Sequence, residues 1–210
     1  MPRPWSMFAA AILAGASASA AEIRLENADF EAEVNARGRV PGWMFTQHSG
    51  TPAYELKIDD ERATKGNRSI RMKRTAEQVY GMIAQRVPGN AYIGQTVEAS
   101  ASIRTEDVGQ QGWVLVMSFL DHGDVLWQER TAPLTGTSGW QRVKLRGKVP
   151  MRTSDIEVGF LLLDGGTGWA DEVTLASLDE TNRTDPSAEK GDGNVTASKR
   201  GKASDSSKRD

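Results

Sequence analysis

The fold of this chain is indicated most clearly by residues 156–175, which read IEVGFLLLDGGTGWADEVTL. In residues 156–162, apolar side chains recur at every second position, which is the period of a β-strand. The glycine-rich segment 164–168 interrupts the pattern with residues that favour turns and tolerate positive φ. A second alternation follows in residues 169–175. The stretch therefore predicts two strands separated by a turn.

One polar residue stands out in the second of these strands. The alternation puts Trp169, Asp171, Val173 and Leu175 on one side, and three of these four are apolar. Asp171 is therefore expected to face the core. A carboxylate in that position must be hydrogen-bonded, ion-paired or metal-bound, because burying it alone would cost several kcal/mol.

Both ends of the chain differ from its middle. Residues 1–20 combine Arg3, an apolar run over 8–16 and the small residues Ala18-Ser19-Ala20, which predicts a cleaved signal peptide and export to the periplasm or medium. An uncleaved anchor or a buried helix is the alternative. Residues 177–210 contain no aromatic residue and are rich in Ser, Asp and Lys, which predicts a disordered tail.

The middle of the chain, residues 22–176, is about as long as one domain with a substantial core. The formal net charge of the whole chain is −2 and the basic residues are scattered along the sequence, which argues against nucleic-acid binding. There is no cysteine, so thiol catalysis, thiolate metal sites and disulfides are excluded. The apolar run near the N-terminus is far shorter than the roughly 20 residues of a membrane span.

Several further segments alternate in the same way between turn residues: 54–59, 69–74, 80–87, 96–104, 125–130 and 140–149. Residues 112–120 differ, because both faces are apolar, which is typical of a central strand or of one that lines a groove as well as the core. No segment shows a sustained helical period. About nine or ten short strands indicate an all-β sandwich or barrel.

The order of several motifs resembles that of the jelly-roll carbohydrate-binding modules and their galactose-binding-domain-like relatives. The motifs are Asn27-x-x-Phe30-Glu31, Pro41-Gly42-Trp43, residues 63–70, residues 101–105, residues 136–141 and residues 168–175. The resemblance covers nearly all of the predicted domain. It implies a two-sheet antiparallel β-sandwich of the jelly-roll type.

The resemblance also implies a structural calcium ion near the chain ends. Its side-chain ligands would be Glu31 and Asp171, with carbonyl groups of Lys65-Gly66-Asn67 as possible partners. Calcium binds six to eight hard oxygen ligands, so these groups are chemically suitable. The alternative is that Asp171 accepts N–H bonds from the backbone or a Trp indole without a metal.

Candidate ligand-binding residues come from the aromatic side chains, since flat rings stack on the C–H faces of sugars. Trp43, Trp113 and Trp127 are the tryptophans not assigned to the signal peptide or to structural positions. Together with Phe119, they are expected to line a concave face, with Gln85, Asp121 and His122 as polar contacts. The alternative is that all these aromatics pack in the core or at its edge.

Catalysis has little support in the sequence. The two histidines, His48 and His122, show no metal-ligand spacing, and no Gly-x-Ser-x-Gly motif is present. The prediction is an exported, non-catalytic protein that binds a glycan on its concave face or loop edge. An envelope structural or adaptor protein that binds another protein is the alternative, and a hydrolase or lyase is a third.

Overall fold

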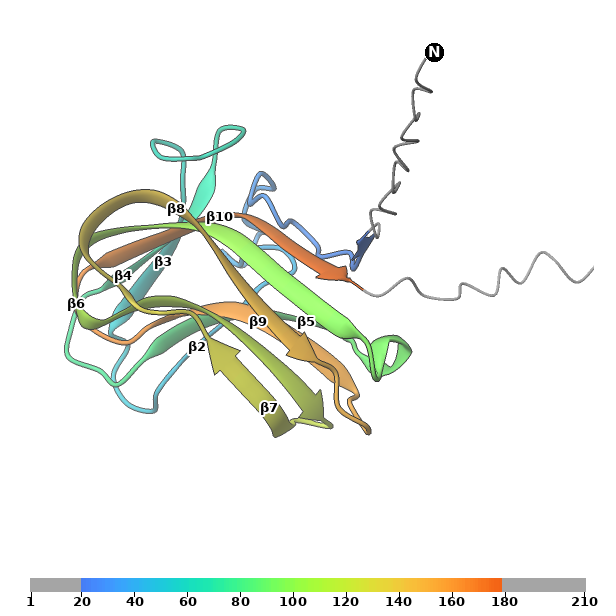
Figure 1. The fold of residues 1–210 in the computed structure, drawn as a ribbon. Helices are drawn as coiled ribbons and strands as arrows, with labels where there is room; N and C mark the ends of the chain where they lie inside the picture. The colour runs from blue at the N-terminus through green and yellow to red at the C-terminus, as the bar shows by residue number, and fades with distance from the viewer. Residues whose placement is uncertain (1–19, 179–210) are drawn as a thin grey trace, which may run out of the picture. The chain divides into compact units, whose positions relative to one another are not determined.

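A computed structural model describes residues 20–178 (Figure 1). The elements are β1 (Ala21–Glu22), β2 (Met44–Gln47), β3 (Tyr54–Asp59), β4 (Ser69–Arg74), β5 (Gly81–Pro88), the 3₁₀ turn η1 (Asn90–Tyr92), β6 (Thr96–Asp121), β7 (Asp124–Arg130), β8 (Leu134–Lys148), β9 (Asp155–Leu162) and β10 (Thr167–Ser177). The predicted signal peptide, apart from its last residue, and the predicted tail from residue 179 onward lie outside the described residues. Within residues 20–178, no helix is long and apolar enough to cross a membrane.

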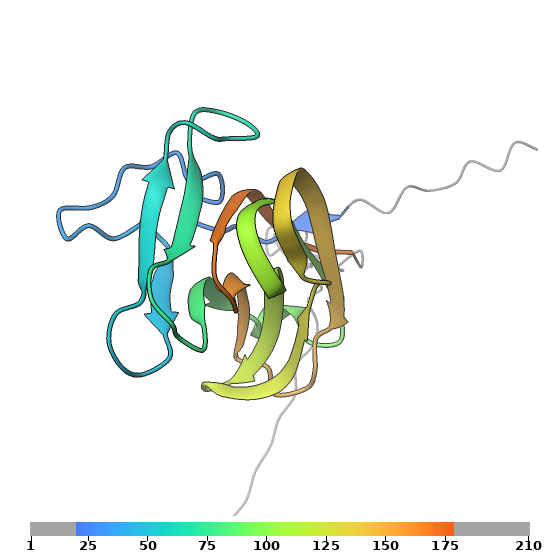
Figure 2. The same cartoon turned by 90° about the vertical axis from the view of Figure 1, so that its left-hand side faces the viewer.

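The strands form two antiparallel sheets that share β6. The first sheet has the order β3-β4-β10-β6-β8, with β1 added to β10, and it uses the first half of β6. The second sheet has the order β2-β5-β9-β6-β7 and uses the second half of β6. The predicted all-β sandwich is thus confirmed. Figure 2 shows β8 lying beside β6.

The long strand β6 joins two segments that the sequence pattern separates, residues 96–104 and 112–120. Gly112 in its middle has φ +78°, and a side chain there would collide with Pro133. Only glycine adopts this conformation without strain, so the strand can turn from one sheet into the other at this point. The neighbouring β8 pairs with β6 from Thr96 opposite Lys148 to Trp113 opposite Leu134.

The core lies between the two sheets and is built from their inner faces. Its aromatic centre is a chain of ring contacts, in which Trp43 lies 5.0 Å from Phe30 and 6.3 Å from Phe160, and Phe160 stacks on Trp113 at 5.4 Å. Each such side chain stabilises the fold by roughly 1.5–3 kcal/mol when fully buried. Residues 20–43, which precede β2, contribute Phe30 and Trp43 and are thereby fastened to the sandwich.

The orientation predicted for Asp171 is wrong, although its burial is confirmed. Trp169 lies opposite Arg71 and Arg104, whereas its neighbour Ala170 lies opposite two core isoleucines, so Trp169 and Asp171 face outward from the first sheet. The register between β10 and β6 then shifts after Asp171, where Glu172 has φ +50°. This bulge turns Val173 and Leu175 inward, which breaks the alternation that the sequence pattern assumes.

Candidate functional site

Two of the predicted ligand-binding aromatics lie in the core. Trp113 and Phe119 have no exposed surface, and the Trp113 indole Nε1 donates to the carbonyl oxygen of Trp169 at 2.9 Å. Their predicted position on an open face is therefore wrong. Both residues lie on the side of β6 that faces the core. Truncating Trp113 to alanine would cost about 3–5 kcal/mol of stability. Such a variant is unsuitable as a probe of ligand binding.

Trp43 and Gln85 hydrogen-bond to the backbone of the N-terminal segment and do not line a ligand-binding surface. The Trp43 indole Nε1 donates to the carbonyl oxygen of Asn27 at 3.0 Å. The Gln85 amide accepts from the Glu26 backbone N–H at 2.7 Å and donates to the Glu26 carbonyl oxygen at 2.9 Å. Both side chains are buried, so their predicted contact with a ligand is also wrong.

The remaining three predicted residues lie toward the β6–β7 end of the sandwich. Trp127 is half-buried and stacks on Phe119 with ring centroids 4.8 Å apart. Asp121 and His122 meet at the turn, where His122 Nδ1 lies 2.7 Å from Asp121 Oδ1. The His122 side chain is 89% exposed, and Arg152 pairs with the other oxygen of Asp121 at 3.1 Å. A ligand role for these three residues stays a prediction.

The two predicted calcium ligands, Glu31 and Asp171, are both held by the turn over residues 64–68. Asp171 Oδ2 accepts from the Thr64 N–H at 2.8 Å, the Thr64 hydroxyl at 2.7 Å and the Lys65 N–H at 3.3 Å, and Oδ1 accepts from the Glu172 N–H at 2.7 Å. Glu31 Oε1 accepts from the N–H groups of Asn67 at 2.7 Å and Arg68 at 2.9 Å. Both carboxylates therefore clamp one turn.

This arrangement does not fit a calcium site as it stands. Both oxygens of Asp171 face N–H or O–H donors, where a hard cation would need them free. Residues 20–178 also contain no cluster of three or more His, Cys, Asp or Glu side chains that could hold a metal ion. A cleft of about 470 Å³ adjoins the clamp and is lined by Asp29, Glu31, Lys65 and Glu172 among others. Calcium binding stays a prediction, and chelation is its test.

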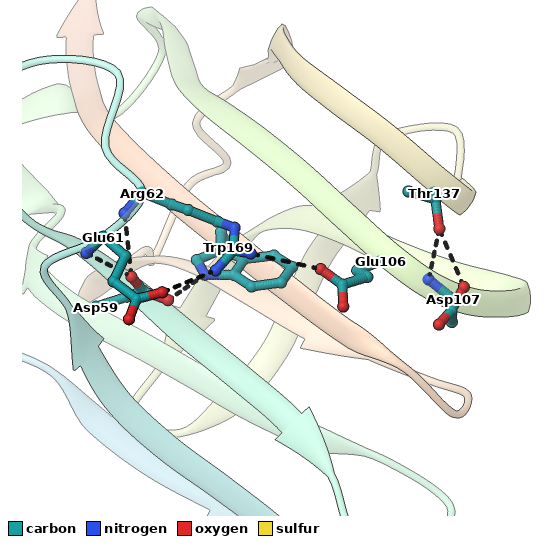
Figure 3. Close-up of polar contacts among 7 residues, drawn as sticks. All are labelled: Asp59, Glu61, Arg62, Glu106, Asp107, Thr137 and Trp169. Carbon is teal, nitrogen blue, oxygen red and sulfur yellow. Dashed lines mark hydrogen bonds and ion pairs between the residues drawn. The ribbon is translucent and has the colours of Figure 1, made fainter.

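Trp169 forms a separate polar cluster on the outer face of the first sheet (Figure 3). Its indole Nε1 donates to Asp59 Oδ2 at 2.7 Å, and the guanidinium groups of Arg62 and Arg104 lie 5.3 and 5.5 Å from its ring centroid. Burial raises the pKa of Asp59. The hydrogen bonds from Trp169 and from the N–H groups of Glu61 and Arg62 outweigh this effect and hold the pKa below its usual value.

A polar row that the sequence did not reveal crosses the outer face of the second sheet. The strand registers place Arg86 on β5 opposite Glu157 on β9, Glu157 opposite Ser118 on β6, and Ser118 opposite Gln128 on β7. Arg86 Nε donates to Glu157 Oε2 at 2.6 Å, and Gln128 Nε2 donates to Ser118 Oγ at 2.9 Å. We call these four residues the polar row.

The surroundings of the polar row are small and apolar. The next row of the same face contains Ala84, Gly159 and Val116, and the one beyond contains Met82, Leu161 and Val114. Ser118 and Glu157 are buried among these neighbours, whereas Arg86 and Gln128 at the ends of the row are exposed. A few convergent polar groups on an apolar floor are typical of a small-molecule or glycan site.

Comparison with known proteins identifies the fold and not a family. No protein-family model matches the sequence. The chain is 29% identical over 150 residues to the uncharacterized HTH-type transcriptional regulator YbfP of Bacillus subtilis (strain 168), a match that covers 68% of this chain and 50% of the regulator. The chain thus spans about half the length of this curated relative.

Solved structures with similar folds include enzymes and a binding module. Tailspike protein 4 of bacteriophage CBA120 (enzymatically active domain) has a TM-score of 0.58 at 13% identity, covering 73% of this chain and 21% of that one. The Stig cyclase FisC of Fischerella sp. TAU has a TM-score of 0.56 at 12% identity, covering 76% and 98%. The CBM22-1 xylan-binding domain of Paenibacillus barcinonensis Xyn10C has a TM-score of 0.48 at 14% identity, covering 73% and 93%.

At these identities the likeness concerns the fold. The chain is a two-sheet antiparallel sandwich of the jelly-roll type, as the sequence motifs predict. Because the same architecture occurs in a cyclase and in a tailspike enzyme domain, function has to be argued from the surface of this chain.

Proposed function

We propose that this protein is an exported, non-catalytic carbohydrate-binding protein that holds a glycan across the outer face of its second sheet. The observation that carries the proposal is the polar row. Arg86, Glu157, Ser118 and Gln128 place donors and acceptors on four adjacent strands, over a distance of roughly 14 Å. This is a suitable length for a short run of sugar units, whose hydroxyl groups both donate and accept hydrogen bonds.

The chemistry of the row supports binding rather than catalysis. Glycosidases use two carboxyl groups about 5–10 Å apart on either side of the scissile bond. The polar row contains one carboxylate, Glu157, which is ion-paired with Arg86 at 2.6 Å. Export is supported by the sequence of residues 1–20, with its apolar run and its small residues before Ala21.

The test is binding of neutral oligosaccharides to the full chain, measured by isothermal titration calorimetry after a glycan-array screen. We expect Gln128→Ala to weaken binding about tenfold, because a lost hydrogen bond with a ligand is worth about 1–1.5 kcal/mol. The matched control is Gln141→Ala. Gln141 Nε2 also donates to a serine hydroxyl, that of Ser138, at 2.9 Å, but it lies outside the polar row.

Three results would reject the proposal. Binding of no neutral glycan by the wild type would favour the alternative of a protein-binding adaptor. Equal weakening by Gln128→Ala and Gln141→Ala would remove the polar row from the site. Hydrolysis or elimination of a bound glycan at high protein concentration would contradict the non-catalytic assignment.

A further inference from the structure

The outer face of the first sheet carries a line of exposed cations. Arg142, Lys144, Arg146 and Lys148 occupy alternate positions of β8, and all four side chains are exposed. Residues two apart on a strand point to the same face and lie roughly 6.7 Å apart, so the line extends over roughly 20 Å. Strand β8 pairs with β6 along one edge, and no other strand within residues 20–178 pairs with it.

The acidic group beside this line lies deeper than the cations. Glu98 accepts from Lys144 Nζ at 2.9 Å and from Arg146 Nε at 2.6 Å. Its side chain is 14% exposed, against 56% for Lys144 and 64% for Arg146. Solvent therefore meets the ammonium and guanidinium groups rather than the carboxylate. Ion pairs that are this exposed contribute roughly 0–1 kcal/mol, so a ligand carboxylate can compete for the cations.

The line continues from β8 toward Trp169. Arg142 lies opposite Ser102 on β6, and Arg104 lies two residues further along the same strand. Arg104 and Arg71 flank Trp169 in register, and the Nε atoms of both arginines are buried without a hydrogen-bond partner among the described residues.

Arg62 covers the same tryptophan but is held loosely. Its ion pairs with Glu61 and Glu106 measure 3.5 and 3.9 Å (Figure 3). A guanidinium group held at these distances is available to pair with a carboxylate in the two-pronged geometry that arginine favours. We call Arg62, Arg104, Arg142, Lys144, Arg146 and Lys148 the basic band.

We propose that the basic band binds a linear acidic polysaccharide, whose successive uronate carboxylates pair with its cations. Hydroxyl and acidic groups interleave with the band: the Arg142 Nη2 atom donates to Ser100 Oγ at 2.7 Å, and Glu172 Oε2 accepts from Ser102 Oγ at 3.2 Å. The cations of the band suit the carboxylates of such a ligand, and the serine hydroxyls and the Glu172 carboxylate suit its hydroxyl groups. A nucleic acid is a poorer match. Its duplex carries one phosphate charge per about 1.7 Å, whereas the cations on β8 are spaced roughly 6.7 Å apart.

This second site goes beyond the function proposed above, since it lies on the other sheet and takes a different class of glycan. The experiment measures the affinity of the full chain for polygalacturonate and for a neutral polysaccharide of similar length. We expect wild type to bind polygalacturonate with a Kd that rises steeply with salt, because exposed charges are screened within about 10 Å at 0.1 M. The double variant Lys144→Gln/Lys148→Gln should bind at least tenfold more weakly.

The matched control is Arg37→Gln/Arg39→Gln, which removes the same number of exposed charges outside the basic band. Both double variants should melt as the wild type does, because Arg146 still pairs with Glu98 in the first of them. No binding of polygalacturonate, or equal losses in the two double variants, would overturn the proposal. Equal losses would instead suggest that the charges on β8 prevent this edge strand from pairing with a second molecule.

Two further results distinguish this proposal from nucleic-acid binding and from binding at the polar row. Equal affinity for a single-stranded oligonucleotide of the same total charge would overturn the assignment to an acidic glycan. Loss of polygalacturonate binding in Gln128→Ala would overturn the placement on the first sheet. Failure of neutral-glycan binding alone would reject the polar row and leave the basic band intact.

Discussion

The two outer faces of this sandwich both contain a buried carboxylate, and they use it differently. On the first sheet, Asp171 accepts hydrogen bonds on both oxygens, from Thr64, Lys65 and its neighbour Glu172. On the second sheet, Glu157 is bonded through one oxygen to Arg86, whose side chain is 45% exposed. Asp171 therefore holds a loop in place, whereas the partner of Glu157 is free to turn toward a ligand.

The two acids differ in the kind of partner that holds them, and burial alone does not reveal this difference. Both residues are less than 10% exposed. They differ in their partners. Asp171 accepts from backbone N–H groups of a turn that is distant in sequence, so it holds that turn in place. Glu157 accepts from the exposed side chain of Arg86, which can exchange this acceptor for another. Paired isosteric substitutions test the distinction directly, because each removes one charge and changes one oxygen to an amide nitrogen.

Asp171→Asn should have the largest effect, about 3 kcal/mol of lost unfolding free energy. Both carboxylate oxygens face donors, so the new NH₂ group must oppose an N–H in either orientation, and unpaired buried donors cost about 1–3 kcal/mol each. Urea unfolding monitored by tryptophan fluorescence measures it. Asp29→Asn is the control, since Asp29 accepts one long bond, at 3.4 Å, in an exposed position. A loss under 1 kcal/mol would contradict the clamp.

The predicted calcium ion would have to displace the N–H and O–H donors that Asp171 accepts from, and chelation tests whether it does. If the ion binds at Glu31 and Asp171, adding EDTA should lower the Tm by several degrees, because about 1 kcal/mol corresponds to roughly 2–4 °C in a domain of this size. Asp171→Asn should then lose the response to EDTA. An unchanged wild-type Tm would mean that the amides of the 64–68 turn hold the two carboxylates without a metal.

The sequence predicted much of the fold because the strands alternate cleanly. Segments 54–59, 69–74 and 125–130 agree with β3, β4 and β7 within a residue. The bulge after Asp171 was not predicted. One extra residue there reverses which side chains face the core, and no residue type in the sequence signals it. Segment 112–120 is apolar on both faces, so its pattern could not tell that Trp113 and Phe119 point inward.

The two candidate sites could not be predicted for a different reason. The polar row joins residues from β5, β9, β6 and β7, and the basic band joins β6, β8 and the loop after β3. Such neighbours depend on strand register, which a single sequence does not specify over long separations. The alternation within residues 140–149 puts Arg142, Lys144 and Arg146 on one side of the strand, but their alignment with Arg104 and Arg62 depends on the register.

Asp59 extends the comparison to a third acid, one bonded to a side chain on the first sheet. Its folded pKa lies below the unfolded value of about 3.9, so its contribution to stability is present above that pH and is lost as pH falls through the folded pKa. Asp59→Asn should be less stable than wild type at pH 7 and lose less stability on acidification. Urea unfolding at pH 7, 4 and 2.5 measures this, with the exposed neighbour Asp60→Asn as control. Parallel pH curves for wild type and Asp59→Asn would contradict the assignment.

Glu157→Gln should have the smallest effect on stability, under about 1 kcal/mol. The amide can keep its oxygen toward Arg86, and the guanidinium, which is 45% exposed, can be solvated if the pair separates. Glycan affinity should fall in the same variant, because the acceptor at the centre of the polar row is replaced in part by a donor. A stability loss as large as that of Asp171→Asn would show that Glu157 is structural, and the contrast between the two faces would then disappear.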